Sequence, residues 1–459
     1  MTVIKGAATE LGTERIRKLL VQYSVPAIIA MTASSLYNMV DSIFIGLGVG
    51  PMAISGLALT FPLMNLAAAF GSLVGVGAAT LISMRLGQKD YASAQYILGN
   101  VVVLNFIIGL GFGLVTLLFL DPILYFFGAS EATIGYARDY MSIILMGNVV
   151  THMYLGLNSV LRSAGHPRKS MYATINTVVI NTILDPLFIY GFGWGIRGAA
   201  IATVLAQVIS LVWQFRLLSD SSELLHFHRG IYRPRKRIVK EILAIGMSPF
   251  LMNVTACFIV ILINKGLKEH GGDLMIGAYG IVNRLAFFFV MIVMGLNQGM
   301  QPIAGYNFGA RQYDRVRRGV RVCLAMAAGI TLFISVTFYN LAEPLFRLFS
   351  QDDAVVAVGV GMMHVLTPVY ITYISIEVLS GALRGCGDVR VPTLITVFFV
   401  CGLRMLWLFV AVPIRHEVAT VELSYPITWT LASALFIVYY LKGGWMQRCA
   451  EKWERKQKA

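Results

Sequence analysis

The stretch 181–203, NTILDPLFIYGFGWGIRGAAIAT, places one carboxylate, Asp185, inside an otherwise apolar segment. A charged side chain at the centre of a bilayer costs about 2.5 kcal/mol or more, so acids in membrane spans usually lie on a transport pathway or pair with another group. Asn181 precedes Asp185 by four residues, which sets the amide and the carboxylate on one helical face. We therefore expect these two residues to share a proton, an ion or a ligand.

A glycine-rich turn follows this helix and separates it from a second apolar run that starts at Arg197. Small residues open that run and allow close contact between helices. Thr203 lies about as far into the returning run as Asp185 lies before the turn, so a helical hairpin would bring both, with Asn181, to one depth. The residues predicted to break the helix are Gly191, Gly193 and Gly195.

The composition indicates an all-α polytopic membrane protein. Hydrophobic residues make up 57% of the 459 residues, charged residues make up 13%, and the mean hydropathy is +0.72. The apolar tracts are too long for the strands of a barrel and fit helices that cross a bilayer. We predict twelve spans, at 17–46, 52–83, 94–120, 134–162, 170–190, 197–218, 240–267, 275–305, 316–342, 358–384, 391–413 and 421–442.

The net charge of +14 is explained by topology. Most Lys and Arg residues fall in the two termini and the even-numbered turns between the predicted spans. The positive-inside rule then places both termini in the cytoplasm and the chain in the cell (inner) membrane. Contact with anionic membrane lipid accounts for the basic surplus better than nucleic-acid binding, which we do not expect.

Catalytic and cofactor motifs are missing from the sequence. The five cysteines show no CxxC spacing, the seven histidines show no metal-binding spacing, and neither a Ser-His-Asp arrangement nor a P-loop is visible. The polar first sixteen residues give no sign of a cleaved signal peptide. We expect no enzyme activity, no cofactor and no ATP-driven step.

The two halves of the chain repeat each other at a constant offset of 222 residues. A duplication of six helices gives parallel repeats about an axis along the membrane normal, as in many secondary transporters. We predict two six-helix lobes, 1–218 and 241–459, joined by a basic cytoplasmic linker, 219–240, with a basic cytoplasmic C-terminal tail. The matching positions are Leu86-Gly87 with Phe308-Gly309, Tyr91 with Tyr313, Asp121-Pro122 with Glu343-Pro344, and Leu161-Arg162 with Leu383-Arg384.

Helix 1 of the first lobe carries a second acid, Asp41, at the height predicted for Asp185. Tyr37 lies one turn below Asp41 on the same face, and Tyr140 could reach the same level from helix 4. The second lobe does not repeat these acids. It has instead three charged residues predicted to form a buried ion pair or triad, Glu377, Arg284 and Arg404.

The chain resembles the multidrug and toxic compound extrusion (MATE) family from end to end. The resemblance rests on YNMVDSIFIG at 37–46, LRSAGHPRKS at 161–170, NTILDPLFIY at 181–190 and GIRGAAIAT at 195–203. It implies two lobes that export amphipathic, often cationic organic compounds in exchange for protons or sodium ions. The stretch of helix 7 at 242–264, ILAIGMSPFLMNVTACFIVILIN, has no acid, so the chain looks closer to prokaryotic branches with a cation site in the N-lobe.

The family's functional residues carry over to positions in the first lobe. The implied cation site, which could hold Na⁺ or a proton, comprises Asp41, Asn181, Asp185 and Thr203. Tyr37, Tyr140 and Asn158 are implied to line the nearby cavity, and Pro26 matches a bend in helix 1. Methionines such as Met31 and Met64 could line a promiscuous cavity, because flexible thioethers accept varied apolar cations.

Alternative interpretations remain open at this point. The two acids could only hold helices together, Glu377 could have a purely structural pairing, and Thr203, Tyr140 and Asn158 could serve packing. A flippase for lipid-linked precursors, from the same superfamily, is the main functional alternative. A channel or an intramembrane enzyme has less support, because the sequence shows no repeated ring of charges. The substrates and the choice between proton and sodium stay open, and we expect a monomer.

Overall fold

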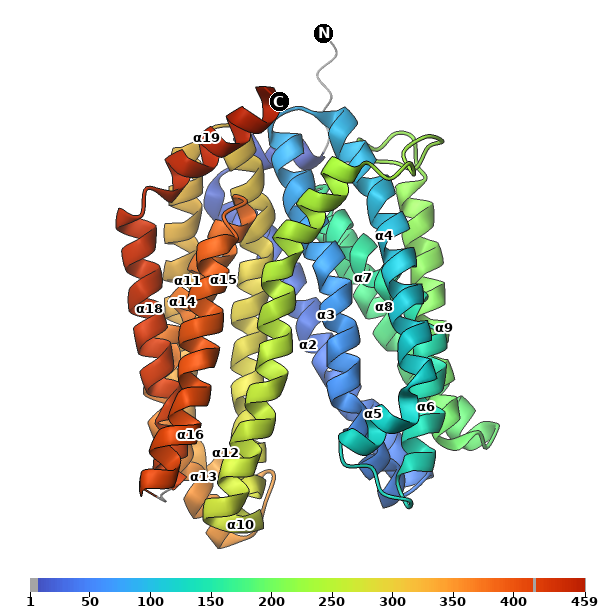
Figure 1. Ribbon diagram of the computed structural model, residues 1–459, viewed down its shortest axis with the longest axis vertical. Helices are drawn as coiled ribbons and strands as arrows, with labels where there is room; N and C mark the ends of the chain where they lie inside the picture. The colour runs from blue at the N-terminus through green and yellow to red at the C-terminus, as the bar shows by residue number, and fades with distance from the viewer. Residues whose placement is uncertain (1–6, 416–417, 459) are drawn as a thin grey trace. The chain divides into compact units, whose positions relative to one another are not determined.

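The computed structural model describes residues 7–415 and 418–458, except for the side chains at 7, 260, 261, 264–277, 412, 415, 418, 419 and 456–458 (Figure 1). Every regular element in these ranges is a helix. The first half contains η1 (Ala7–Thr9), α1 (Glu10–Thr13), α2 (Ile16–Gly48), α3 (Pro51–Gly87), α4 (Tyr91–Leu118), α5 (Leu120–Phe126), α6 (Ile134–Met146), α7 (Asn148–Ser163), α8 (Pro167–Pro186), the π-helical turn η2 (Leu187–Gly191) and α9 (Gly195–Leu218).

The second half begins with the longest element, α10 (Lys236–Gly309). The remaining elements are α11 (Tyr313–Asn340), α12 (Ala342–Arg347), α13 (Asp353–Leu366), η3 (Thr367–Val369), α14 (Tyr370–Gly385), α15 (Arg390–Ile395), the π-helical η4 (Thr396–Gly402), α16 (Leu403–Arg415), α17 (Val418–Glu422), α18 (Ser424–Lys442) and α19 (Trp445–Lys458).

The predicted all-helical fold with about twelve membrane spans is confirmed. Among the described residues, 11 helices are long and apolar enough to cross a membrane, and the bent pair α6–α7 brings the number to 12 if it is one span. Two of these spans, Lys236–Ile259 and Ala278–Gly309, lie within α10. The predicted boundaries agree to within several residues. The fourth predicted span, 134–162, differs from the prediction because the helix is bent by 57° at Gly147, between α6 and α7.

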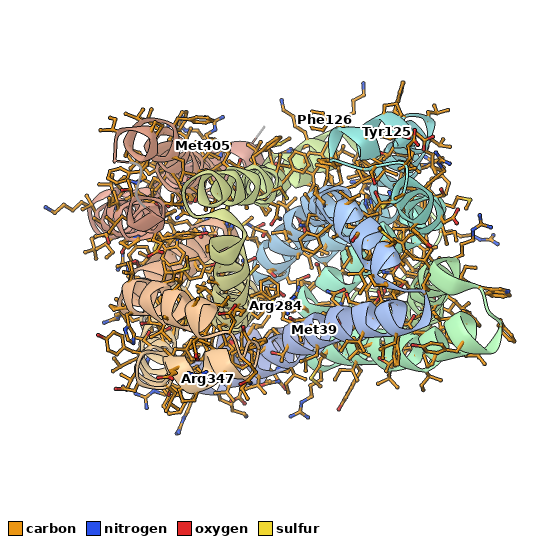
Figure 2. All side chains as sticks on the ribbon, turned by 90° about the horizontal axis from the view of Figure 1, so that it is seen from below. Met39, Tyr125, Phe126, Arg284, Arg347 and Met405 are labelled. Carbon is orange, nitrogen blue, oxygen red and sulfur yellow. The ribbon has the colours of Figure 1, made fainter. Side chains whose placement is uncertain are left out.

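Large apolar side chains cover the outside of the helices. Phe126 of α5 exposes 83% of its side-chain surface, and Phe333 of α11 exposes 72%. Figure 2 shows Tyr125 and Phe126 at the edge of the molecule. In water such a surface would drive aggregation, whereas in a bilayer it contacts lipid tails. The chain is therefore a multi-pass membrane protein.

The chain forms two compact units. The first contains Met1–Glu14, Val25–Asn253 and Gly305–Arg311, and the second contains Arg15–Ser24, Val254–Ala304 and Gln312–Ala459. Both α2 and α10 therefore contribute to both units. Pro26 lies inside α2, two residues after Ser24, where the part of α2 that belongs to the second unit ends. The proline ring removes one helical hydrogen bond there. A bend there stays a prediction.

Close glycine contacts inside each unit follow the internal repeat. A Cβ on Gly77 would lie 3.1 Å from the Gly246 nitrogen in the first unit. A Cβ on Gly299 would lie 2.6 Å from the Ser24 nitrogen in the second unit. Since 77 and 299 are related by the offset of 222, and so are 24 and 246, the two contacts are equivalent. The duplication is thus preserved in three dimensions. The beginning of α2 belongs to the second unit, and in the same way the beginning of α10 belongs to the first unit.

Candidate functional site

The two predicted acids meet inside the first unit. Asp41, on α2, and Asp185, in the last turn of α8, are both buried. The two carboxyl groups lie next to each other, and two like charges so close together favour the binding of a proton or a cation. The Oδ1 atom of each acid has no hydrogen-bond partner within the described part of the chain. Two buried acceptors are thus left for a proton or a cation, because buried polar atoms are rarely unsatisfied.

A chain of polar side chains extends from this acid pair. The Asn181 amide is oriented so that its nitrogen donates to Asp185 Oδ2 at 2.8 Å and its oxygen accepts from Thr203 Oγ1 at 3.2 Å. We assign this orientation because it satisfies both ends of the amide. Tyr37 Oη lies 3.0 Å from Thr203 Oγ1. The structure therefore brings Asn181, Asp185 and Thr203 to one depth, as the hairpin argument predicts.

The turn between α8 and α9 creates this geometry. After Pro186 the helix widens into η2, and Gly193 and Gly195 adopt positive φ angles of 67° and 57°, which suit glycine. Gly198 lets α9 approach η2, because a Cβ there would lie 2.8 Å from the Phe188 carbonyl. This close approach places Thr203, little more than one turn further along α9, beside Asn181 of α8.

Tyr140 belongs to the same cluster. It lies on α6, is only 1% exposed, and its hydroxyl is close to Thr203 and to both acids. The assembled ligand atoms are the oxygens of two carboxyl groups and of nearby hydroxyl groups, since the Asn181 oxygen is turned to Thr203. Such hard oxygen ligands suit a proton or a small monovalent cation and leave a negative site when both are absent.

Comparison with known proteins identifies the family. A family model described as MatE matches residues 26–187 and 245–410, once in each half. The chain belongs to the MATE family. Multidrug export protein MepA of Staphylococcus haemolyticus is 30% identical over 381 residues, which are 83% of this chain and 84% of MepA. MepA of Staphylococcus aureus strain N315 is 28% identical over 380 residues, with the same coverage. This MATE chain is a membrane transporter rather than an enzyme.

Solved structures share the fold. A multidrug resistance MATE family transporter of the MOP superfamily, in an outward-facing conformation, superposes with a TM-score of 0.88, at 21% identity over 97% of this chain and 98% of the other. A MATE crystal structure in a bent conformation gives a TM-score of 0.89, at 21% identity over 97% and 99% of the two chains. At this identity the likeness establishes the fold alone.

Three predicted cavity residues of this MATE chain lie outside the acid cluster. Asn158 donates to Thr174 Oγ1 at 2.9 Å and accepts from Ser170 Oγ at 2.5 Å, so it belongs to a second network between α7 and α8. Met64 is half-buried and accepts a weak hydrogen bond from Thr60 at 3.7 Å. Met31 is also half-buried, ten residues before Asp41 on α2. Their role as cavity residues stays a prediction.

The predicted partners of Glu377 are wrong. Asn297 Nδ2 donates to Glu377 Oε1 at 2.5 Å, and Arg384 Nη2 lies 4.0 Å from the same oxygen. Arg384, which is 4% exposed, follows Glu377 by seven residues on α14, so both side chains lie on one helical face. That spacing could have identified the pair from the sequence.

Arg404 is stabilised by aromatic rings rather than by Glu377. Its Nη2 donates to Thr428 Oγ1 at 2.7 Å, and its guanidinium carbon lies 4.1 Å from the centre of the Tyr425 ring. The third predicted member, Arg284, has an exposed side chain (Figure 2). A buried guanidinium can therefore be satisfied by a hydroxyl and a π face, without a carboxylate. The predicted triad does not form.

Proposed function

We propose that this MATE chain is a secondary-active exporter of amphipathic, often cationic organic compounds, driven by inward movement of protons or sodium ions. Relatives named as multidrug export proteins support export of small compounds. The observation that carries the exchange mechanism is the buried pair Asp41 and Asp185, with an unsatisfied oxygen on each acid. The contacts of this pair do not require both acids to be ionised. The affinity of the pair for cations therefore changes with its protonation.

Exchange follows from competition at this site. When the pair holds no extra proton or metal cation, its negative charge favours retention of a cationic compound nearby. When a proton or Na⁺ arrives from outside, it neutralises the carboxylates and removes that attraction. By linkage, whatever factor the ion applies to drug affinity, the drug applies to ion affinity. Loading with ion and loading with drug thus exclude each other, as antiport requires.

The driving force is sufficient for export. One elementary charge that moves inward across a potential of 100 mV releases about 2.3 kcal/mol. At about 1.4 kcal/mol per factor of ten, this sustains a concentration ratio on the order of 40 when one net charge moves inward per exported compound, as for an uncharged compound with one ion or a monovalent cation with two. We place the chain in the cell membrane with both termini in the cytoplasm, and a monomer suffices because one unit of one chain holds the whole acid cluster.

The test is efflux of a fluorescent organic cation from proteoliposomes under a pH gradient alone and then under a sodium gradient alone. Asp41→Asn and Asp185→Asn remove the titrating groups with little change of shape and should lower gradient-driven efflux at least about tenfold. Asp121→Asn is the matched control, because that carboxylate forms an exposed ion pair with Arg138 at 2.7 Å.

The gradient that drives efflux names the coupling ion. Wild-type efflux rates in purified Asp41→Asn and Asp185→Asn would contradict the proposal. If no organic cation is transported but a fluorescent lipid analogue is, the flippase alternative holds.

A further inference from the structure

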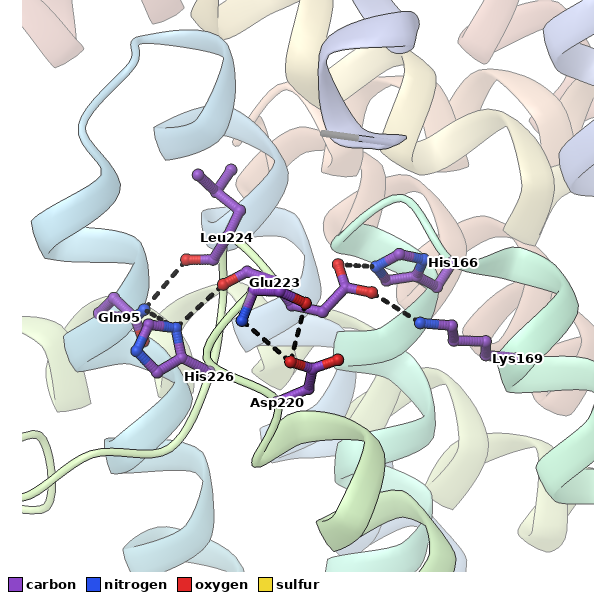
Figure 3. Close-up of polar contacts among 8 residues, drawn as sticks. Gln95, His166, Lys169, Asp220, Glu223, Leu224 and His226 are labelled. Atoms are coloured by element: carbon purple, nitrogen blue, oxygen red, sulfur yellow. Dashed lines mark hydrogen bonds and ion pairs between the residues drawn. The ribbon is translucent and has the colours of Figure 1, made fainter. Parts of the chain in front are cut away.

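The segment that joins α9 to α10, residues 219–235, is attached to the first unit by its side chains. Glu223 accepts from His166 Nε2 at 2.9 Å and from Lys169 Nζ at 2.7 Å. Gln95 of α4 donates to the Leu224 carbonyl oxygen at 3.0 Å (Figure 3). These contacts come from α4 and from the turn between α7 and α8. The first part of the segment is therefore held at two places.

The second part of the segment runs directly over α4. The buried Asn100 donates to the Arg233 carbonyl at 3.4 Å and accepts from the Arg235 backbone nitrogen at 3.1 Å. Gly99 allows this approach, since a Cβ there would lie 2.1 Å from the Ile231 oxygen. The beginning of α10 is thus fixed in place, and its outward face is a defined surface.

The opposite face of α10 is buried against α3. A Cβ on Gly77 would lie 2.1 Å from the Ile242 oxygen, and a Cβ on Gly246 would lie 1.6 Å from the Leu73 oxygen. The nearby Glu241 is also buried, with Arg85 Nη2 at 3.7 Å from its carboxylate. These contacts turn the acidic side chain inward. The outward face keeps its lysines.

That outward face borders a shallow, largely open groove, lined by one side of α10 alone, with about 580 Å³ of accessible space. Lys236 and Lys240, one helical turn apart, stand at one end, and both are exposed. The rest of the groove is apolar. Ala244 keeps it hollow, because its small side chain follows Lys240 by one turn on the exposed face. The lining residues are Lys236, Val239, Lys240, Leu243, Ala244 and Met247.

The order of charge and apolar surface matches an amphiphile. Lys236 begins the span Lys236–Ile259, so the two lysines lie at the membrane boundary. Met247 lies seven residues beyond Lys240, which is about 10 Å deeper along the helix. Two lysines whose Cβ atoms lie about 6 Å apart on one helical face can both reach one phosphate. A free anion would use the lysines and leave the apolar part empty, whereas a phospholipid uses both.

We infer that this groove, the α10 lipid groove, binds one anionic phospholipid, with its phosphate between Lys236 and Lys240 and one acyl chain along Leu243, Ala244 and Met247. The inference is independent of the transported substrate and of the coupling ion. Each basic residue near a membrane surface adds about fivefold to the affinity for an anionic lipid, so the two lysines together give a preference of about 25-fold over a zwitterionic lipid.

The test uses the full chain, purified in detergent, with bound lipid counted by native mass spectrometry. Titration with phosphatidylglycerol and phosphatidylcholine should show one phosphatidylglycerol retained with a preference of roughly 25-fold. A photoactivatable phosphatidylglycerol should cross-link to the peptide 236–247. Lys236→Gln/Lys240→Gln should abolish both the preference and the cross-link. Ala244→Leu, which fills the groove and keeps the charge, should weaken binding of both lipids.

The matched control is Arg229→Gln/Arg233→Gln, which removes the same amount of charge from two exposed side chains of the preceding segment, 219–235, outside the groove. This variant should retain the lipid and the cross-link. The inference is overturned if the lysine variant keeps the wild-type preference, if both double variants lose it equally, or if the cross-link maps elsewhere in the wild type. Displacement of the lipid by millimolar inorganic phosphate, with no effect of Ala244→Leu, would assign a simple anion site instead.

Discussion

The contact between Gly87 and Gly309 provides the sharpest test of the internal repeat. Both residues belong to the first unit, at the ends of α3 and α10. A Cβ on Gly87 would lie 2.0 Å from the Tyr306 oxygen, and a Cβ on Gly309 would lie 2.1 Å from the Met84 oxygen. The offset of 222 relates Gly87 to Gly309 and Met84 to Tyr306. Reciprocal contacts of this kind occur at a twofold axis.

The size of the effect follows from these distances. Ordinary contacts of a Cβ atom begin at 3.4 Å, so Gly87→Ala must push the two helices apart by more than 1 Å. The opposing atom is a backbone oxygen, which cannot rotate away. Overpacking of this kind costs about 1–3 kcal/mol, against a helix-propensity gain of at most about 1 kcal/mol. We expect a net loss of about 1–2 kcal/mol in the free energy of unfolding.

Unfolding in mixed micelles, followed by tryptophan fluorescence, measures this loss. Gly111→Ala is the matched control, because a Cβ on Gly111 of α4 would meet no atom within 4 Å. It should leave the free energy of unfolding unchanged or raise it by up to about 1 kcal/mol. The double variant Gly87→Ala/Gly309→Ala should lose at least about 0.5 kcal/mol less than the sum of the single losses, because one separation relieves both clashes. Equal stability of Gly87→Ala and Gly111→Ala would refute the reasoning.

Two further predictions concern buried and interfacial charges. Glu377→Gln leaves Arg384 buried beside a neutral amide and should lower the free energy of unfolding by about 3–5 kcal/mol. The double variant Glu377→Gln/Arg384→Met should recover part of this loss. Equal stability of Glu377→Gln and the wild type would contradict a role for the pair. Burial lowers the pKa of His166 below its usual 6.5. Burial acts to raise the pKa of Glu223, but the hydrogen bond from Lys169 and the charge of His166 outweigh it and lower that pKa below 4.5. Both groups bind protons more weakly when folded, so their stabilisation is present above these values and is lost as the pH falls. The hydrogen-exchange protection factors in the segment 219–235, which are corrected for the intrinsic exchange rate at each pH, should fall as the pH drops below about 6.5, with a smaller change in Glu223→Gln.

The spans and the hairpin could be predicted from the sequence because they depend on local properties. A run of apolar residues fixes where a helix crosses the membrane, and glycines with positive φ fix where it turns back. Within such a hairpin, helical spacing alone brings Asn181 and Asp185 onto one face, and the symmetric position of Thr203 brings it alongside. Asp41 required one further assumption, equal height in the membrane, and the structure places it against Asp185.

The features that the sequence did not reveal depend on contacts between distant segments. The bend at Gly147 accompanies a close approach by Val204 of α9, whose Cγ atoms would lie 2.7 Å from a Cβ at that glycine. The C-terminal segment was predicted as a basic tail because of its charge. It forms the helix α19, with Trp445, Cys449 and Trp453 buried at intervals of four residues. The spacing of these three residues can be read in the sequence, but the sequence does not reveal which surface of the protein covers them.

Under the proposed exchange mechanism, the difference between the buried charges of the two halves favours the first unit as the place of ion coupling. An ion can drive a transporter only if its binding changes the relative energies of two states. Glu377 has Asn297 and Arg384 against it, and Arg404 has Thr428 and an aromatic face, so their charges are already compensated. An arriving cation would have to displace these partners. Each acid of the Asp41–Asp185 pair instead keeps an unsatisfied oxygen, so an arriving proton or sodium ion gains new contacts there without breaking an ion pair.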